Sequence, residues 1–164
     1  MSSTRLPTRL LALATLSICL RAAPIHAAPP AHDHDHAGAP AKLSLNAGKK
    51  WATDEPLRKA MATIRGAMEA SLPAIHAGKL ADSQYAALTK TVNDEIAYIV
   101  SNCKLDPKAD AQLHLIIAQI ADGTEAMDGK SGKLTRQDGA VKVLGALKNY
   151  GSHFDHPAWK PIRH

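Results

Sequence analysis

Three histidines near the start of the chain alternate with aspartates. They are His32, His34 and His36, separated by Asp33 and Asp35 in a sequence of 164 residues. In an extended chain alternate residues point to the same side, so the three imidazoles can approach one metal ion together. Imidazole suits copper, nickel and zinc, and short histidine-rich tracts are typical of metal capture. A polar tail that only aids solubility has the same composition, and this alternative stays open.

A second set of metal-ligating side chains is spread over the later part of the chain. Thiol, thioether and imidazole groups together are a ligand set for copper, zinc or haem iron. His153 and His156 are three residues apart, a spacing at which two helical side chains can chelate one ion. The set consists of Met61, Cys103, His114, His153 and His156.

Each member of this set also fits an ordinary structural role. Met61 and Cys103 continue apolar stripes and would fill a core. His114 borders an apolar face, where a half-buried structural histidine is equally well placed. His153 and His156 would interact with the negative end of a helix. For the metal site we expect Cys103 to be the main soft ligand, because the start of the next helix would lower the pKa of its thiol.

The first 27 residues have the layout of a secretory signal. Arg5 and Arg9 precede an apolar run of 11 residues at 10–20, which is too short to cross a bilayer, and small residues follow before Ala27. We therefore predict a signal peptide at 1–27 and a periplasmic mature protein without a membrane span. Copper is the ion we expect in that compartment.

The composition of the mature chain excludes several classes of protein. The signal carries three of the 20 basic residues, so 17 remain beside 15 acidic ones, and no basic stripe for nucleic acid stands out. Cys103 is the single cysteine after cleavage and cannot close an intrachain disulfide. No catalytic triad spacing, phosphate-binding loop or zinc-protease motif occurs. We predict a metal-binding protein and not an enzyme, with a periplasmic protein partner left open.

Helical periodicity follows a histidine-rich arm. Residues 28–50 begin with a stretch rich in Ala, Pro, Gly, His and Asp and predict a disordered arm. Residues 51–164 predict an all-α domain, because apolar residues recur there every three or four positions. Four helices are expected, at about 54–77, 82–104, 107–129 and 135–156.

Local signals support the ends of these helices. Asp106 before Pro107 is an N-cap with proline at the first helical position, and Thr135 with Asp138 resembles a capping box. Pro157 stops the last helix. The apolar stripe expected on that helix is Val141, Leu144, Leu147, Gly151 and Phe154.

The connections between the predicted helices are short, which makes neighbouring helices antiparallel. The predicted fold is therefore an up-down-up-down antiparallel four-helix bundle. In this topology the starts of the first and third helices meet the ends of the second and fourth. The second set of metal-ligating residues belongs to that end of the bundle, which predicts a second metal site there.

This layout is similar to the cytochrome b562 family, in which four antiparallel helices hold haem between a methionine of the first helix and a histidine near the end of the fourth. Met61 and His153 stand at matching places. The resemblance therefore implies haem b as an alternative cofactor and electron transfer as an alternative function. Met68 is a second methionine in the same helix, and Cys103 and His114 have no counterpart in the family's pattern.

A second resemblance covers most of the mature chain. The runs GKKWATDEPLR, CKLDPKADAQLHLIIAQI and LKNYGSHFDHPAW resemble exported proteobacterial proteins labelled DnrO. This group brings no activity with it, so the resemblance implies export and adds no mechanism. A cofactor-free bundle that serves interaction or stress resistance stays open beside the copper and haem hypotheses.

Overall fold

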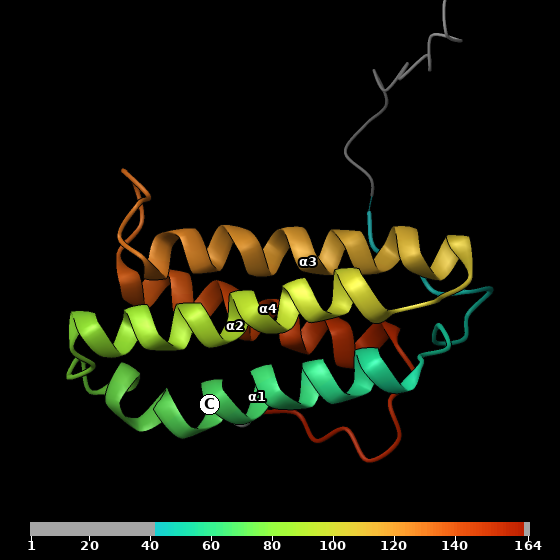
Figure 1. Ribbon diagram of the computed structural model, residues 1–164, viewed down its shortest axis with the longest axis horizontal. Coiled ribbons are helices and arrows are strands. Elements are labelled where there is room, and N and C mark those ends of the chain that lie inside the picture. Colours follow the sequence, from blue (N-terminus) through green and yellow to red (C-terminus); the bar gives the residue numbers. More distant parts are fainter. Residues whose placement is uncertain (1–41, 163–164) are drawn as a thin grey trace, which may run out of the picture. The chain divides into compact units, whose positions relative to one another are not determined.

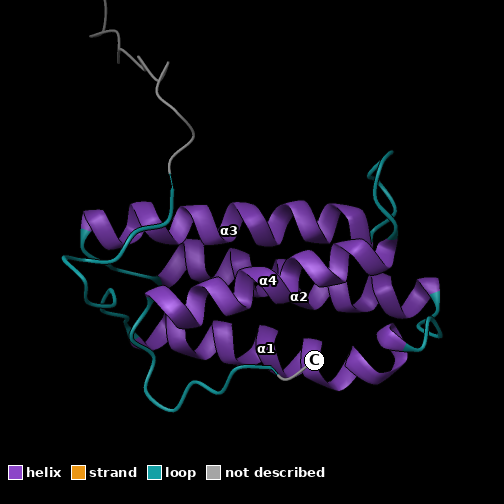
Figure 2. Ribbon diagram, turned by 180° about the vertical axis from the view of Figure 1, so that it is seen from behind, coloured by secondary structure: helices purple, strands orange, loops and turns teal. Residues whose placement is uncertain are grey.

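Four α-helices form the body of the protein in a computed structural model, which describes residues 42–162 (Figure 1). They are α1 (Glu55–His76), α2 (Asp82–Asn102), α3 (Pro107–Met127) and α4 (Arg136–His153). Within the described residues there is no strand, and β-type pairing is confined to isolated bridges (Figure 2). The predicted all-α four-helix fold is confirmed. None of the described helices combines the length and apolar character needed to span a membrane.

The helices pack as two tightly associated pairs. Contact is most extensive between α3 and α4, then between α1 and α2, and it is sparser between α2 and α3 and between α1 and α4. Successive helices run in opposite directions in Figure 1. Their apolar faces meet in one core, because each stripe can be buried only against another helix. The largest fully buried side chains include Leu57, Met61, Ile64, Met68, Ile99, Leu113, Ile116, Ile120, Met127, Tyr150 and Phe154.

Two buried glycines let α3 and α4 approach each other closely. A Cβ atom on Gly139 would lie 2.5 Å from the carbonyl oxygen of Gly123 and 2.6 Å from the backbone nitrogen of Met127. A Cβ atom on Gly123 would lie 2.8 Å from the carbonyl oxygen of Gly139. Backbone atoms cannot yield as a flexible side chain can, so this helix spacing requires glycine on both sides.

Arg136 joins three elements at the end of the bundle where α3 turns into α4. Its guanidinium donates to the Met127 carbonyl at 2.5 Å and lies 3.2 Å from the Asp82 carboxylate at the start of α2. The capping box predicted beside it is confirmed. Thr135 N–H donates to Asp138 Oδ2 at 2.9 Å, and Asp138 N–H donates to Thr135 Oγ1 at 3.1 Å.

All four helices end earlier than the sequence predicts, α1 by one residue, α2 and α3 by two and α4 by three. α2 ends at Asn102, and Cys103 is its C-cap residue with extended backbone. α4 ends at His153, because Phe154 adopts an extended conformation and pairs with Trp51. His156, predicted in the last turn of the helix, therefore lies beyond it. Tertiary pairing with a distant segment decides this end, and no local signal reports such pairing.

The apolar stripe predicted on α4 is wrong at Val141, whereas its members Leu144, Leu147 and Phe154 are buried as predicted. The Val141 side chain is 57% exposed, whereas Val143 and Tyr150 are fully buried. Positions 141 and 143 lie about 200° apart around a helix, so only one of them can face the core. Val143 does so, next to the glycine contact with α3.

Part of the predicted arm is ordered. Over 42–50 the chain forms a turn at 46–49, closed by two backbone hydrogen bonds. Ser44 N–H donates to Gln112 Oε1 in α3 at 2.8 Å, and the Trp51 indole N–H donates to the Ser44 carbonyl at 2.7 Å. The predicted boundary between the disordered arm and the helical domain, at residue 50, is therefore misplaced, because Trp51 is buried and anchors the residues before it. The signal peptide and His32, His34 and His36 lie outside the described residues and stay predictions.

The last described residues, 155–162, form a strap that folds back toward α1 (Figure 1). Arg65 Nε in α1 donates to the Lys160 carbonyl at 2.5 Å. The indole of Trp159 lies against Gly151, and its ring centroid is 4.9 Å from that of Tyr150. The strap and the Trp51 segment together cover the end of α4.

Gly139→Ala tests the close contact between α3 and α4. We expect it to lower the free energy of unfolding by about 1–3 kcal/mol, because an added methyl group forces backbone shifts in a packed core. Gly145→Ala is the matched control on the same helix, since its Cβ would meet nothing within 4 Å. There the better helix propensity of alanine should stabilise the protein by up to about 1 kcal/mol. Urea unfolding measures both, and equal effects would contradict the contact.

Candidate functional site

The candidate site lies where α2 ends and α3 begins. The carboxylate of Asp54, the N-cap of α1, holds this corner in place. Its Oδ1 accepts a hydrogen bond from Leu57 N–H at 2.9 Å, which caps α1. Its Oδ2 accepts from Lys104 N–H at 2.7 Å, which fixes the α2–α3 connection. One side chain thus joins the start of α1 to the end of α2.

Cys103 sits next to this carboxylate. Its backbone N–H donates to the Ile99 carbonyl at 2.9 Å, and its half-buried thiol is not in a disulfide. Burial raises the pKa of the thiol to about 12, with further contributions from the charge of Asp54, a hydrogen bond to Asp54 and the charge of Asp110. The expected lowering of this pKa by the start of α3 is wrong, because desolvation and the two carboxylates disfavour the thiolate.

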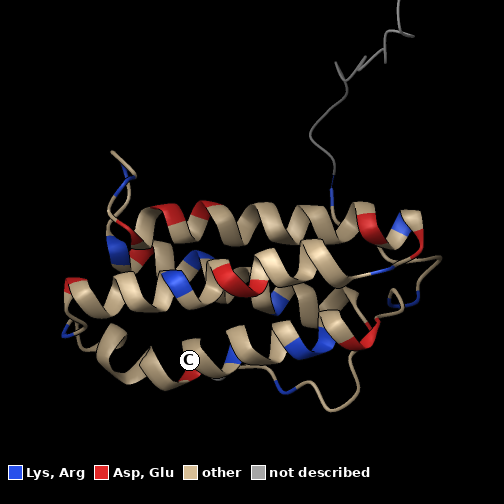
Figure 3. Cartoon of the chain, in the orientation of Figure 1, with Lys and Arg blue, Asp and Glu red and all other residues tan. Residues whose placement is uncertain are grey.

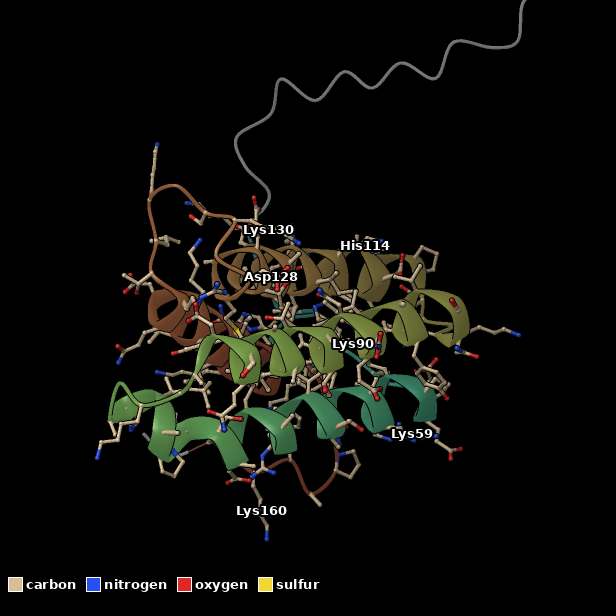
Figure 4. The ribbon with its side chains drawn as sticks, turned by 60° about the vertical axis from the view of Figure 1, so that its left-hand side comes forward. Lys59, Lys90, His114, Asp128, Lys130 and Lys160 are labelled. Atoms are coloured by element: carbon tan, nitrogen blue, oxygen red, sulfur yellow. The ribbon has the colours of Figure 1, made fainter. Side chains whose placement is uncertain are left out.

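His114 lies one turn after Asp110 on α3 and is labelled in Figure 4. Its Nδ1 is 2.9 Å from the Asp110 carbonyl oxygen and 3.4 Å from the Asp110 carboxylate. Because a carbonyl oxygen can only accept, Nδ1 carries the hydrogen and Nε2 keeps its lone pair. This is the tautomer in which histidines commonly bind metals through Nε2. The side chain is 65% exposed, so it has room to turn.

Cys103, Asp110 and His114 line one surface pocket of about 190 Å³ between the end of α2 and α3. Cys103, the C-cap residue of α2, and His114 of α3 thus border the same space. Apolar side chains make up the other walls: Ile99, Val100, Leu113 and Ile117.

The two histidines near the end of α4 do not form the expected chelating pair. His153 Nδ1 donates to the Asn149 carbonyl at 2.8 Å within its own helix. His156 lies beyond the helix, where its Nδ1 is 3.0 Å from Tyr150 Oη and its ring centroid is 5.0 Å from that of Trp159. The i and i+3 geometry does not apply, because α4 ends at His153.

Met61 lies fully buried in the core. A side chain without exposed surface has no space beside it even for a water molecule, so an ion or a haem iron could reach the sulfur only if the core opened. The residues present therefore do not fit a haem held between Met61 and His153. Within residues 42–162 no group of three or more His, Cys, Asp or Glu side chains is gathered to hold a metal ion. Of the five predicted ligands in this range, Cys103 and His114 share a pocket.

Charge does not single out another surface. In the view of Figure 3, basic and acidic positions alternate along the bundle and occur together at both of its ends. Several of them are paired, including Arg65 with Glu69 at 2.9 Å and Lys90 with Asp94 at 2.6 Å.

Sequence reasoning missed the two carboxylates that act on Cys103, those of Asp54 and Asp110. Asp110 precedes His114 by four residues, the spacing at which helical side chains meet, so a signal for this contact was available. Asp54 stands 50 residues before Lys104, which its carboxylate holds. No local pattern reveals a contact over that separation, and its effect on Cys103 could be found only from the fold.

No family model matches the chain. The comparisons with curated proteins and with solved structures likewise gave no match. The resemblances to the cytochrome b562 family and to the exported proteins labelled DnrO stay predictions, and the functional argument rests on the sequence and the geometry.

We expect Asp54→Asn to lower the pKa of the Cys103 thiol, because it removes a negative charge beside the sulfur. Burial remains, so the pKa should stay above that of an exposed cysteine. The measurement is the rate at which iodoacetamide alkylates Cys103 in the native protein, followed from neutral to alkaline pH. Asp106→Asn is the matched control, since Asp106 caps α3 through Lys108 N–H at 2.9 Å. An equal change of the pH profile in both variants would contradict the role of Asp54.

His156 should make stability depend on pH. Burial lowers its pKa, and the positive charge of Arg58 lowers it further. The unfolded chain then binds a proton more readily at His156 than the folded protein, so stability falls as the pH drops below about 6.5. His156→Gln should remove this part of the dependence in melting curves recorded from neutral to mildly acidic pH. His76→Gln, exposed at the end of α1, should leave it unchanged, and the reverse result would refute the assignment.

Proposed function

We propose that this chain is an exported metal-binding protein and that copper is its ion. The observation that carries the proposal is the alternation of His32, His34 and His36 with Asp33 and Asp35. Three imidazoles within five residues give one ion several nitrogen ligands at a low cost in chain ordering. The segment from 1 to 27 supports export to the periplasm, where such a capture segment would meet the ion.

The chemistry of the motif suits a divalent ion. Neutral imidazoles supply the nitrogen ligands that copper prefers among the common side chains. The interleaved carboxylates of Asp33 and Asp35 add negative charge, which raises the local concentration of cations. Because a protonated imidazole cannot bind metal, capture should weaken in acid and recover at neutral pH.

A cofactor-free interaction bundle is the second candidate. The observation that favours it is the closed core, in which Met61, Met68 and Tyr150 have no exposed surface. A bundle packed in this way can present partners with its outer faces and needs no internal ligand. We do not propose the haem carrier, because the buried Met61 does not fit it.

Replacing His32, His34 and His36 together by Ala tests the proposed function. We expect the affinity of the full mature chain for Cu(II), measured by isothermal titration calorimetry, to fall by roughly tenfold or more. Replacing Asp33 and Asp35 by Asn is the matched control, since it keeps the imidazoles and should weaken binding far less.

Thermal unfolding gives a second readout, because an ion that binds only the folded protein must raise its melting temperature. The capture motif itself precedes the helices, so Cu(II) bound there should leave the melting temperature of the bundle nearly unchanged. If the histidine-free variant binds Cu(II) as tightly as the natural chain, the motif is not the ligand. If the natural chain binds no copper at all, the interaction bundle replaces the metal-binding proposal.

A further inference from the structure

We propose that the pocket between the end of α2 and α3 binds a soft monovalent metal ion, Cu(I) or Ag(I), between Cys103 Sγ and His114 Nε2. The inference rests on the proposed function in that it assigns the protein a second metal ion. It uses other residues than the histidine motif, so each can fail without the other.

A hydrogen bond within α3 leaves one ring nitrogen of His114 available to bind a metal ion. Its Nδ1 donates to the Asp110 carbonyl at 2.9 Å, which leaves the Nε2 lone pair for a metal. A hydrogen bond of this kind orients the ring and fixes the tautomer at known histidine metal sites. The exposure of the ring, 65%, allows a small rotation toward the pocket without any displacement of the core.

Cys103 contributes the soft ligand from the opposite wall. Its thiol is half-buried and lines the same pocket as His114. Binding breaks the S–H bond and forms a bond from sulfur to the ion, the proton passes to solvent, and the ion keeps its oxidation state. A bare thiolate is disfavoured beside Asp54 and Asp110. A thiolate bound to a cation is not, because the positive ion is attracted by both carboxylates.

The position of the pocket adds to the attraction for a cation. It lies where α2 ends and α3 begins, so the partial negative charge at the end of α2 is opposed by the partial positive charge at the start of α3, and the Asp110 carboxylate lines the same pocket. Ile99, Val100 and Leu113 form apolar walls, which exclude water from one side of the ion. Charge attraction and an apolar surround together suit a soft, weakly hydrated ion better than a strongly hydrated one.

The small number of ligands also favours a monovalent ion. Structural zinc takes four ligands, and calcium takes six or more oxygens. Within residues 42–162 no group of three or more His, Cys, Asp or Glu side chains is gathered to hold a metal ion. The Asp110 carboxylate, which lines the same pocket, lies 3.4 Å from His114 Nδ1, and both oxygens of Asp54 already accept backbone hydrogen bonds. Thiolate ligands select Cu(I) among the common copper states, and Ag(I) is a redox-stable probe with similar preferences.

The test uses the full mature chain in which His32, His34 and His36 are replaced by Ala, so that the capture motif cannot mask the pocket. Ag(I) is titrated in the presence of a competing chelator, and the alkylation of Cys103 is followed at each point. We expect one equivalent of Ag(I) to bind and to slow alkylation by roughly tenfold or more. A sulfur-to-metal absorption band should grow in parallel.

Four further variants are compared in this background. Cys103→Ser should abolish tight binding, and His114→Ala should weaken it by about 10–100-fold. His76→Ala is the matched control, because this exposed histidine lies at the far end of α1, and it should bind Ag(I) like the parent. Cys103→Ala covers the case in which serine disturbs folding, and melting curves identify any such variant.

The outcomes separate the two proposals. Undiminished Ag(I) binding by Cys103→Ser and Cys103→Ala overturns the pocket site. Equal protection of Cys103 in His114→Ala overturns the pairing of the two side chains. If the natural mature chain does not capture Cu(II) through His32, His34 and His36, while Ag(I) still protects Cys103, the proposed function fails and the pocket site stands. If the natural chain captures Cu(II) through this motif, but Ag(I) does not slow the alkylation of Cys103, the pocket site fails and the proposed function stands.

Discussion

The Asp54 carboxylate is the constraint on which this end of the bundle depends. It caps α1, holds the connection between α2 and α3 through Lys104, and sets the environment of Cys103. Arg136 has the corresponding task at the other end, where it ties α3 to the start of α2. Between these two ends the helices are paired mainly by their apolar faces, with a few polar contacts such as the hydrogen bond from the Asn149 amide to Gln119 Oε1 at 2.7 Å.

The close contact between α3 and α4 belongs to a tightly packed core. Gly123 and Gly139 bring the two backbones together, and the remaining core is filled by long side chains such as Met61 and Tyr150. Met61 and Tyr150 have no exposed surface. At the corner between α2 and α3, Cys103 and His114 line one surface pocket.

Much of the fold could be predicted from the sequence, because helix formation here is signalled locally. The apolar period of α1 and α3 and the caps at Asp106 and Thr135 are such signals. Topology also placed Cys103 and His114 at the same corner, since antiparallel helices with a short connection bring their ends together. The rest depends on contacts between distant segments. Trp51 decides where α4 ends and thereby removes His156 from the helix, and burial beside Asp54 reverses the expected shift of the Cys103 pKa.

The raised pKa of the Cys103 thiol affects how this side chain reacts. The thiolate, not the thiol, attacks disulfides and oxidants, so a thiol that burial and two carboxylates keep protonated reacts slowly. In the oxidising compartment that the signal segment predicts, a lone exposed thiolate would be lost to disulfide exchange. In the proposed site a soft metal ion replaces the thiol proton. The carboxylates that disfavour the bare thiolate attract this ion. The surroundings of Cys103 thus suppress its reactivity toward oxidants while they favour its bond to a cation.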